Sequence, residues 1–414
     1  MSTSATTPQA SGFELRSSLR RIFFGNMWRT LAGLLGVMQI LVVEWAVVVL
    51  LGREGFGAGL GFGLAALLVA ANLATVPLLR RARMYGGEAR RAARVYMAVG
   101  ITTLLVGLAV AVSWLGLFPV TAVLGWIGLG AEGGFALFRV LSVGLVGAVA
   151  FSAVWAFTGG QQKVDRSRIC VPIEGLHEAH RGLEILHLTD LHIGNGLEGE
   201  RLDRMVADAN AMQPDLIVLT GDIFDFDPAY VEDGAQRLAG LRARLGVFAV
   251  LGNHDTYTGT DHVVDHLARL APGIRLLRDE WVRLPLPDPL YVAGIEDPGR
   301  DWTNRSVHLE ALDTLAEEMP QDGPVLLLVH RPQAFPQAAK LGFPLMLAGH
   351  THGGQLALPF RRGQTVNLAR VMTTYTRGLY QMHGTTMYVS RGIGVAGPAV
   401  RFNCAREMAT IELV

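Results

Sequence analysis

The sequence is poor in cysteine and in charged residues. Only Cys170 and Cys404 occur among 414 residues, and Lys, Arg, Asp and Glu together make up 17% of the chain. Two isolated cysteines provide neither a disulfide framework nor a thiolate metal motif, and this usage suits a reducing compartment. Hydrophobic residues, in contrast, make up half of the chain, and most of this excess lies in the first 160 residues.

The few charges are unevenly distributed. Residues 1–168 contain fifteen Lys and Arg against six Asp and Glu, so the remainder of this net-neutral chain is negative by nine charges. An acidic second half argues against a nucleic-acid-binding groove there, and we expect no nucleic-acid partner. Bound divalent cations would offset part of the negative charge.

Four long apolar stretches cover residues 31–51, 57–79, 95–117 and 136–158. Each approaches the roughly 20 residues that a helix needs to cross a bilayer. They predict a four-helix transmembrane domain at residues 31–158, in contact with membrane lipids. The preceding tail, residues 1–30, begins with a Ser/Thr/Ala-rich segment typical of disorder. Glu44 lies inside the first stretch, where an ionisable group is either functional or a packed polar residue at a helix interface.

Basic residues flank the four stretches on one side. They precede the first stretch, separate the second from the third and follow the fourth, whereas the other two loops hold few charges. This distribution predicts both termini on the cytoplasmic side of the inner membrane. The segment Arg20–Phe24 partly resembles a twin-arginine export signal, but such a signal normally precedes a single cleavable stretch.

After a polar segment at residues 159–182, interpreted as a linker, residues 183–414 form a second domain. Short apolar runs alternate with helical spacing, which predicts parallel strands joined by crossovers. The predicted strands are Leu183–Thr189, Asp215–Thr220, Val247–Leu251, Val325–Val329 and Phe343–Ala348. In such sheets ligands bind at the carboxyl ends of the strands.

Each of these predicted strands is followed by residues of types that can bind metals or transfer protons. The series is Asp190 and His192, then Asp222, then Asn253 and His254, then His330, and finally His350 and His352. The pair His-x-His is a weak signal alone, but the whole series at strand ends predicts a metal centre. Carboxylates mixed with imidazoles, without thiolates, favour Mn, Fe, Zn or Co over Ca.

The series Asp-x-His, Gly-Asp, Gly-Asn-His-Asp, His and Gly-His-Thr-His resembles the calcineurin-like metallophosphoesterase family. The resemblance implies an α/β fold, a two-sheet sandwich flanked by helices, and two divalent metal ions. One ion would be held by Asp190, His192, Asp222 and His352, and the other by Asp222, Asn253, His330 and His350.

The resemblance also implies a metal-dependent phosphoesterase, because paired metal ions can activate water and hold phosphoryl oxygens. His254 would stabilise or protonate the leaving group, and Asp255 would orient its ring as carboxylates do for catalytic histidines. Arg391 and Arg331 are candidates for binding the phosphate, with surface arginine as the alternative reading.

The segments Gly378–Tyr380 and Met387–Gly394 look like the membrane-associated bacterial branch of this family, which includes phosphodiesterases and UDP-2,3-diacylglucosamine pyrophosphatases. We therefore expect a phosphorylated small-molecule or lipid-linked substrate, cleaved at a phosphodiester or pyrophosphate bond at the membrane surface. The alternatives are a phosphodiesterase for soluble nucleotides anchored by the spans, a non-catalytic receptor or scaffold, and a transporter with a regulatory domain. The native metal and the oligomeric state are left open.

Overall fold

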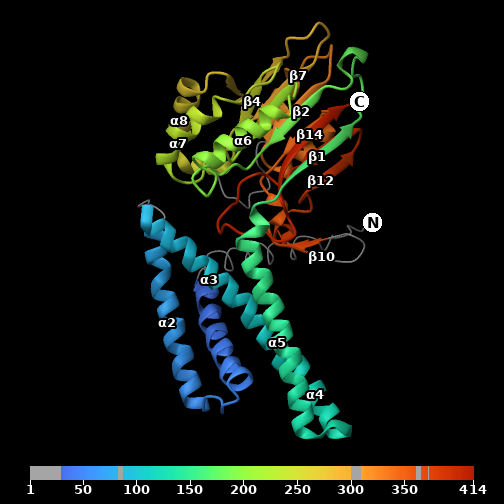
Figure 1. The fold of residues 1–414 in the computed structure, drawn as a ribbon. Coiled ribbons are helices and arrows are strands. Elements are labelled where there is room, and N and C mark those ends of the chain that lie inside the picture. The colour runs from blue at the N-terminus through green and yellow to red at the C-terminus, as the bar shows by residue number, and fades with distance from the viewer. Residues whose placement is uncertain (1–28, 83–86, 300–308, 360–364, 372) are drawn as a thin grey trace, which may run out of the picture. The chain divides into compact units, whose positions relative to one another are not determined.

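The computed structural model describes residues 29–82, 87–299, 309–359, 365–371 and 373–414 (Figure 1). Most of the predicted tail, residues 1–30, and part of the basic loop between the second and third apolar stretches lie outside these ranges. The chain divides into two compact units, Met1–Val154 and Trp155–Val414.

The first unit is helical in its described residues except for residues 51–57. Helix 29–45 continues into a π-helical turn, Ala46–Leu50, and is followed by α2 (Ala58–Ala82) and α3 (Gly87–Val112). A π-helical turn (Ser113–Leu117), α4 (Phe118–Leu124), a second such turn (Gly125–Leu129) and α5 (Gly130–Phe157) complete it. Its core contains Trp45, Val49, Val110, Phe138 and Val146.

The described residues hold three helices long and apolar enough to cross a membrane, Arg29–Leu50, Ala58–Thr75 and Ala92–Gln161. The prediction of four separate spans is therefore not confirmed, because residues 118–135 continue the helical path between the third and fourth predicted stretches. Within the longest segment the backbone leaves helical geometry at Gly130, where φ is 73° and ψ is 161°.

This longest segment folds back on itself. Val110 and Phe138 share one buried cluster, and the rings of Trp114 and Phe138 lie 4.9 Å apart. A straight helix would place Val110 about 42 Å from Phe138 at 1.5 Å per residue. The segment therefore consists of two helical limbs packed against each other.

Glu44 has a structural partner in this unit. Its two carboxylate oxygens accept the backbone N–H of Phe56 at 2.9 and 3.0 Å. The carboxylate thus ties the first helix to the residues before α2, which fits a packed polar residue.

The second unit is built on two six-stranded sheets. The first has the order β1-β14-β2-β3-β4-β5 and the second β12-β13-β9-β8-β7-β6. The strands of the first are β1 (Val164–Val171), β14 (Arg406–Leu413), β2 (Glu184–Leu188), β3 (Leu216–Thr220), β4 (Val247–Val250) and β5 (Ile274–Leu276). Those of the second are β12 (Gly378–Met382), β13 (Thr385–Val389), β9 (Leu345–Ala348), β8 (Val325–Val329), β7 (Tyr291–Ile295) and β6 (Glu280–Arg283). A separate hairpin pairs β10 (Ala357–Pro359) with β11 (Thr365–Asn367).

Apolar side chains join these sheets and helices into four layers (Figure 1). Between the sheets, Ile185, Val218 and Phe248 pack with Leu328 and Leu347. The outer face of the first sheet packs on α6 (Glu200–Ala211), α7 (Val231–Leu238) and α8 (Asn253–Leu270), and the second sheet packs on α9 (Leu309–Glu317) and α10 (Phe335–Lys340). The fully buried strands explain the unbroken apolar runs in the sequence.

The structure differs from the sequence analysis at residues 159–182, which were interpreted as a linker. Strand β1 lies inside this segment and pairs in parallel with β14 from Val164↔Arg406 to Val171↔Leu413. Its side chains alternate between exposed and less exposed positions, as expected for a strand with one solvated face. Mixed charge concealed this period of two.

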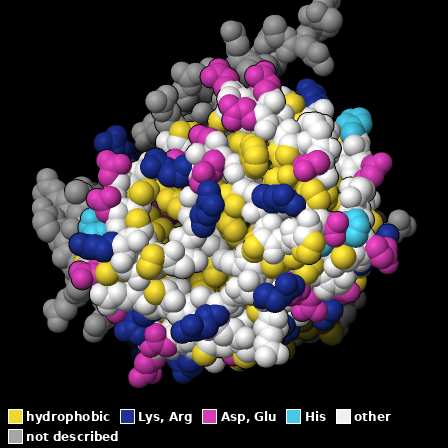
Figure 2. Space-filling view, turned by 90° about the horizontal axis from the view of Figure 1, so that it is seen from above, with side chains coloured by type: hydrophobic (Ala, Val, Ile, Leu, Met, Phe, Trp, Pro, Cys, Tyr) yellow, Lys and Arg dark blue, Asp and Glu magenta, His cyan; other side chains and the backbone are white. Residues whose placement is uncertain are grey.

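One face of the molecule mixes both signs of charge. Figure 2 shows one face on which Lys and Arg side chains are interspersed with Asp and Glu, with hydrophobic side chains scattered among them.

Candidate metal centre

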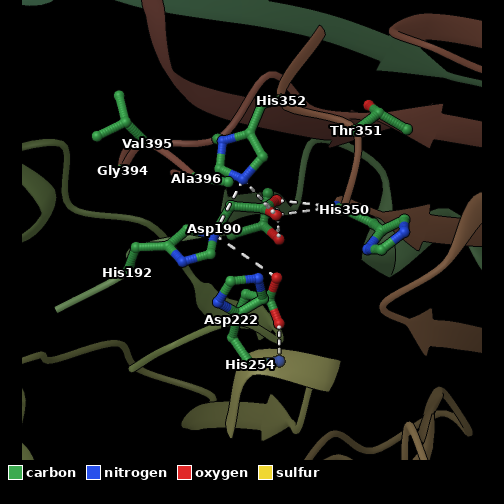
Figure 3. Close-up of polar contacts among 12 residues, drawn as sticks. Asp190, His192, Asp222, His254, His350, Thr351, His352, Gly394, Val395 and Ala396 are labelled. Carbon is green, nitrogen blue, oxygen red and sulfur yellow. Dashed lines mark hydrogen bonds and ion pairs between the residues drawn. The ribbon is translucent and has the colours of Figure 1, made fainter. Parts of the chain in front are cut away.

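The two sheets bring the predicted ligands together at the carboxyl ends of their strands. From the first sheet, Asp190 and His192 follow β2, Asp222 follows β3, and Asn253 follows β4 as the first residue of α8. From the second, His330 follows β8, and His350 and His352 follow β9. Figure 3 shows the carboxylates of Asp190 and Asp222 facing the rings of His192 and His352.

Asp190, His192 and His352 form one group, whose ligand atoms all lie within 4.8 Å of one another. His352 Nε2 is 3.3 Å from Asp190 Oδ1 and 2.9 Å from His192 Nε2. His192 Nε2 also lies 3.6 Å from Asp222 Oδ2.

Asp222, His330 and His350 form a second group that meets the same criterion. His330 Nε2 is 3.2 Å from Asp222 Oδ2 and 3.1 Å from His350 Nδ1. Asp222 therefore contacts histidines of both groups. The side-chain oxygen of Asn253 is buried and has no hydrogen-bond partner.

The backbone is strained at most of these positions. Non-glycine residues rarely adopt positive φ, yet φ is +51° at Asp190, +52° at Asp222 and +70° at His350. His192 and His352 are at +47° and +51°. Such strain persists only where the surrounding structure enforces it, and it concentrates at functional sites.

Two glycines let the main chain approach the carboxylates closely. A Cβ atom at Gly252 would lie 2.2 Å from Asp222 Oδ1, and one at Gly349 would lie 2.3 Å from Asp190 Oδ2. Any larger residue would displace the carboxylates, so glycine at both positions keeps this space open.

The electrostatics of the site favour an ionised Asp222 and neutral rings at His350 and His352. Burial alone would lower the pKa of His330, but the neighbouring Asp222 raises it to about 10. Burial alone would raise the pKa of Asp222, but the neighbouring His330 and His254 charges hold it well below its usual range. Burial raises the pKa of Asp190, and the Asp222 charge adds to this. Burial, together with the neighbouring cations, lowers the pKa of His350 and His352 well below that of a free imidazole, so both rings are neutral.

These residues fit a divalent metal. Asn253 Oδ1 is buried without a hydrogen-bond partner. Buried polar atoms normally have partners, and an unpartnered amide oxygen together with two groups of clustered carboxylate and imidazole atoms suits a cation. The donor set of imidazole, carboxylate and amide oxygen is that of a transition-metal site.

Asp225 is a site residue that the sequence analysis missed. Its Oδ1 is 3.0 Å from His192 Nδ1 and 2.8 Å from His254 Nδ1, and the three residues form a third group of close ligand atoms. Burial alone would raise the pKa of Asp225, but the hydrogen bonds with His192 and His254 lower it, so the carboxylate is ionised. The sequence signal that could have identified Asp225 is an acidic residue three positions after Asp222.

Asp255, which the sequence analysis assigned to orient His254, has different contacts. Its carboxylate accepts the backbone N–H groups of Gly252, Ile223 and Phe224 at 2.9, 3.2 and 2.8 Å. Burial raises its pKa to about 6. Because the His254 ring is bonded to Asp225, Asp255 instead joins the two loops that follow β3 and β4.

The two arginines predicted to bind phosphate have acidic partners in the protein. Arg331 is only 1% exposed, and its Nε and Nη2 donate to the buried carboxylate of Asp297 at 2.5 and 3.1 Å. Arg391 donates to Asp165 and to Glu407 at 3.0 and 2.8 Å. Neither sequence signal could reveal the acid that comes from another strand or loop.

Comparison with known proteins identifies the class. The model of the calcineurin-like phosphoesterase family matches residues 183–354. An uncharacterized metallophosphoesterase of Aquifex aeolicus is 33% identical over 232 residues, which are 56% of this chain and 85% of the relative. The chain therefore belongs to the calcineurin-like metallophosphoesterase family.

A second relative combines this domain with membrane segments. It is a "transmembrane protein with metallophosphoesterase domain" of Danio rerio, 31% identical over 271 residues, which are 64% of this chain and 60% of the relative. The chain spans about 60% of the length of the first curated relatives it matches. The structure of a dimetal phosphatase of Danio rerio aligns over 56% of this chain and 93% of its own, at 15% identity and a TM-score of 0.36.

These findings confirm the predicted family, with bacterial proteins among the relatives, and the predicted class of metal-dependent phosphoesterase domain. They also imply divalent metal ions and a phosphorylated substrate. The apolar helices and the transmembrane relative indicate association with a membrane.

Proposed function

We propose that this protein is a membrane-bound phosphohydrolase with two divalent metal ions, which cleaves a phosphodiester or pyrophosphate bond in a lipid-linked or nucleotide-linked substrate. One observation supports this most strongly. Two groups of ligand atoms meet at Asp222, and a histidine held by its own carboxylate, His254, lies beside them.

In this proposal each ligand group receives one ion. Asp190, His192 and His352 would hold the first, and Asn253, His330 and His350 would hold the second. Asp222 lies beside histidines of both groups. When bound, the ions would supply Lewis acidity to phosphoryl oxygens and to water. The two groups of clustered ligand atoms and the unpartnered oxygen of Asn253 support this assignment.

The chain itself would supply proton transfer and orientation. Because His254 Nδ1 is bonded to Asp225, Nε2 is the ring nitrogen that can face a substrate and protonate the leaving oxygen. The backbone N–H of His254 donates to Asp222 Oδ1 at 2.8 Å, which keeps the ring next to the ligand groups. Asp225 also bonds His192, so one carboxylate orients both rings. Asp255 holds the loops that carry Asp222 and Asn253.

The membrane part of the proposal concerns topology and substrate. The Gly130 break and the packing of α3 on α5 support four crossings rather than three. The loop charges support a cytoplasmic catalytic domain in the inner membrane, with residues 31–158 as the transmembrane domain and 183–414 as the phosphoesterase domain. A substrate at the membrane surface would give the helices a role beyond anchoring.

The catalytic proposal is tested by measuring bound metal and hydrolysis of bis-p-nitrophenyl phosphate and a UDP-linked lipid. We expect about two ions per purified full-length chain and a loss of activity of at least about 10³-fold in Asp222→Asn, typical when a group acting in the transition state is removed. The matched control is Asp261→Asn, the same chemical change at an exposed position of α8. A wild-type protein without metal or turnover when supplied with Mn would contradict catalysis and favour a receptor or scaffold.

The topology is tested with the two natural cysteines, because Cys170 is exposed and Cys404 is buried. A membrane-impermeant maleimide should label Cys170 only after the inner membrane is opened. Labelling in intact spheroplasts, abolished in Cys170→Ser, would place the catalytic domain outside.

A further inference from the structure

Two exposed aromatic rings lie beside the proposed proton donor. Phe226 is 45% exposed and Tyr257 is 37% exposed, although aromatic side chains of this size are usually more deeply buried. The rings lie 4.5 Å and 5.6 Å from the ring of His254, measured between centroids. Neither residue belongs to the metal ligands or to the sequence motifs discussed above.

The two rings are parallel to within a few degrees. Their planes differ by 8° and their centroids are 5.6 Å apart, which is an offset stack. In such a stack each ring keeps one face that the other ring does not cover, and both side chains are partly exposed. An uncovered aromatic face suits another planar ring, whereas a hydrocarbon chain is better held in a groove.

The structure holds both rings in place. Phe226 has a φ of +39°, a strained value for an aromatic residue. Its turn is fixed by the N–H of Asp225 donating to Ile193 O and the N–H of Ala229 donating to Asp227 Oδ1. Tyr257 lies one helical turn after Asn253 on α8.

We propose that Phe226 and Tyr257 form a stacking subsite for a planar ring, such as a nucleobase or an aryl group, carried by the substrate next to its leaving oxygen. This inference rests on the proposed function, because the position of the leaving group is taken from His254. It narrows the substrate class to phosphoesters that carry a ring. The nucleotide-linked substrates are thereby favoured over lipids that carry only hydrocarbon chains.

Binding to full-length, Mn-loaded protein tests the subsite without requiring turnover. Uridine 5′-monophosphate and ribose 5-phosphate share a sugar phosphate and differ in the base, and n-octyl phosphate carries a chain instead. Stacking of one base contributes about 1–3 kcal/mol in other proteins, so we expect uridine 5′-monophosphate to bind about 5- to 150-fold more tightly than ribose 5-phosphate.

Substitutions separate ring stacking from apolar contact. Phe226→Leu and Tyr257→Leu should bring this ratio close to one, because leucine retains apolar surface but has no ring. Phe226→Trp and Tyr257→Phe should retain the ratio, and so should Leu379→Ala, which removes an exposed apolar side chain on β12. All of these positions are exposed, so the variants should fold.

Three results would overturn the proposal. They are a wild-type ratio near one, tighter binding of n-octyl phosphate than of uridine 5′-monophosphate, or a ratio that survives both leucine substitutions. A high ratio in a protein without hydrolytic activity would keep the subsite and reject only the catalytic proposal.

Discussion

The metal-type side chains and the buried arginines of the phosphoesterase unit are equally hidden from water, but their polar atoms differ in what they contact. The carboxylates and imidazoles form two groups in which the ligand atoms lie within 4.8 Å of one another. Arg401, in contrast, donates through Nη2 to the carbonyls of Arg391, Gly392 and Gly394 at 2.8, 3.0 and 2.7 Å, although its Nε has no partner.

Arg406 and Arg331 follow the same pattern as Arg401. Arg406 donates to the carbonyls of Gln161 and Ile393 at 2.6 and 2.7 Å, and Arg331 is paired with Asp297. The arginines hold the loops behind the ligands, while the carboxylate and imidazole atoms of the ligands gather within 4.8 Å of one another. This clustering of ligand atoms distinguishes the binding site from its structural support, although burial alone does not.

The largest expected effect on the unfolding free energy comes from disrupting a contact of the buried arginines. Asp297→Ala would leave Arg331 buried without its carboxylate, and breaking a buried pair in this way costs about 3–5 kcal/mol of unfolding free energy. Denaturant unfolding of the detergent-solubilised protein measures it, with Asp261→Ala as the exposed control. A change below about 0.5 kcal/mol would show that other contacts satisfy Arg331.

His187 is buried but belongs neither to the metal-type ligands nor to the buried arginines. Its Nε2 is 2.7 Å from Thr220 Oγ1, whereas its Nδ1 has no partner. Burial lowers its pKa to about 4 from 6.5, with Glu407 opposing the shift. Between pH 6.5 and 4 the unfolded chain binds a proton that the folded protein does not. The unfolding free energy should therefore fall by about 3 kcal/mol as the pH decreases through this window.

The control for His187 is His187→Gln, which keeps a polar side chain that does not titrate. The difference in unfolding free energy between wild type and variant should depend on pH only between about 4 and 6.5. Parallel pH curves for the two proteins would contradict a buried neutral His187.

Metal binding should stabilise the folded protein through the ligand groups around Asp190 and Asp222, and not through the buried arginines. At an ion concentration a hundred times the dissociation constant, one bound ion raises the unfolding free energy by about 2.7 kcal/mol. Thermal unfolding with and without Mn should show this gain in wild type and in Asp297→Ala, but a smaller gain in Asp222→Asn. An equal gain in all three proteins would place the ion elsewhere.

The sequence predicted the proximity of the metal-type side chains better than the contacts of the arginines, for a physical reason. Asp222 and His330 follow apolar strands, and Asp190 follows β2, which is apolar except for Glu184 and His187. Parallel strands deliver their ends to one edge of the sheet. Local order thus determines their proximity. Arg331 and Arg391 gave the same local signal, but their partners, Asp297 and Glu407, come from other parts of the fold.

Asp225 and β1 were missed for related reasons. Asp225 lies in a turn, and its role depends on two rings that approach it from the loops after β2 and β4. β1 is recognisable as a strand only through β14, which lies more than 200 residues later in the chain. The two-layered sheet core was predictable because its strands are apolar throughout, whereas the edge strand depends on a distant partner.

The smallest expected effect concerns Asp225, which acts through other residues. Loss of a carboxylate that orients a metal-binding histidine typically reduces metal affinity or activity 10- to 100-fold. We expect Asp225→Asn to lower kcat for bis-p-nitrophenyl phosphate by this factor, because asparagine accepts a weaker hydrogen bond from His254 and His192. If Asp225 acts through His254, then Asp225→Asn combined with His254→Gln should lose little more activity than His254→Gln alone. Additive losses, with reduced metal content in Asp225→Asn, would instead assign its effect to His192 and make this carboxylate a support of the ligand set rather than of the proton donor.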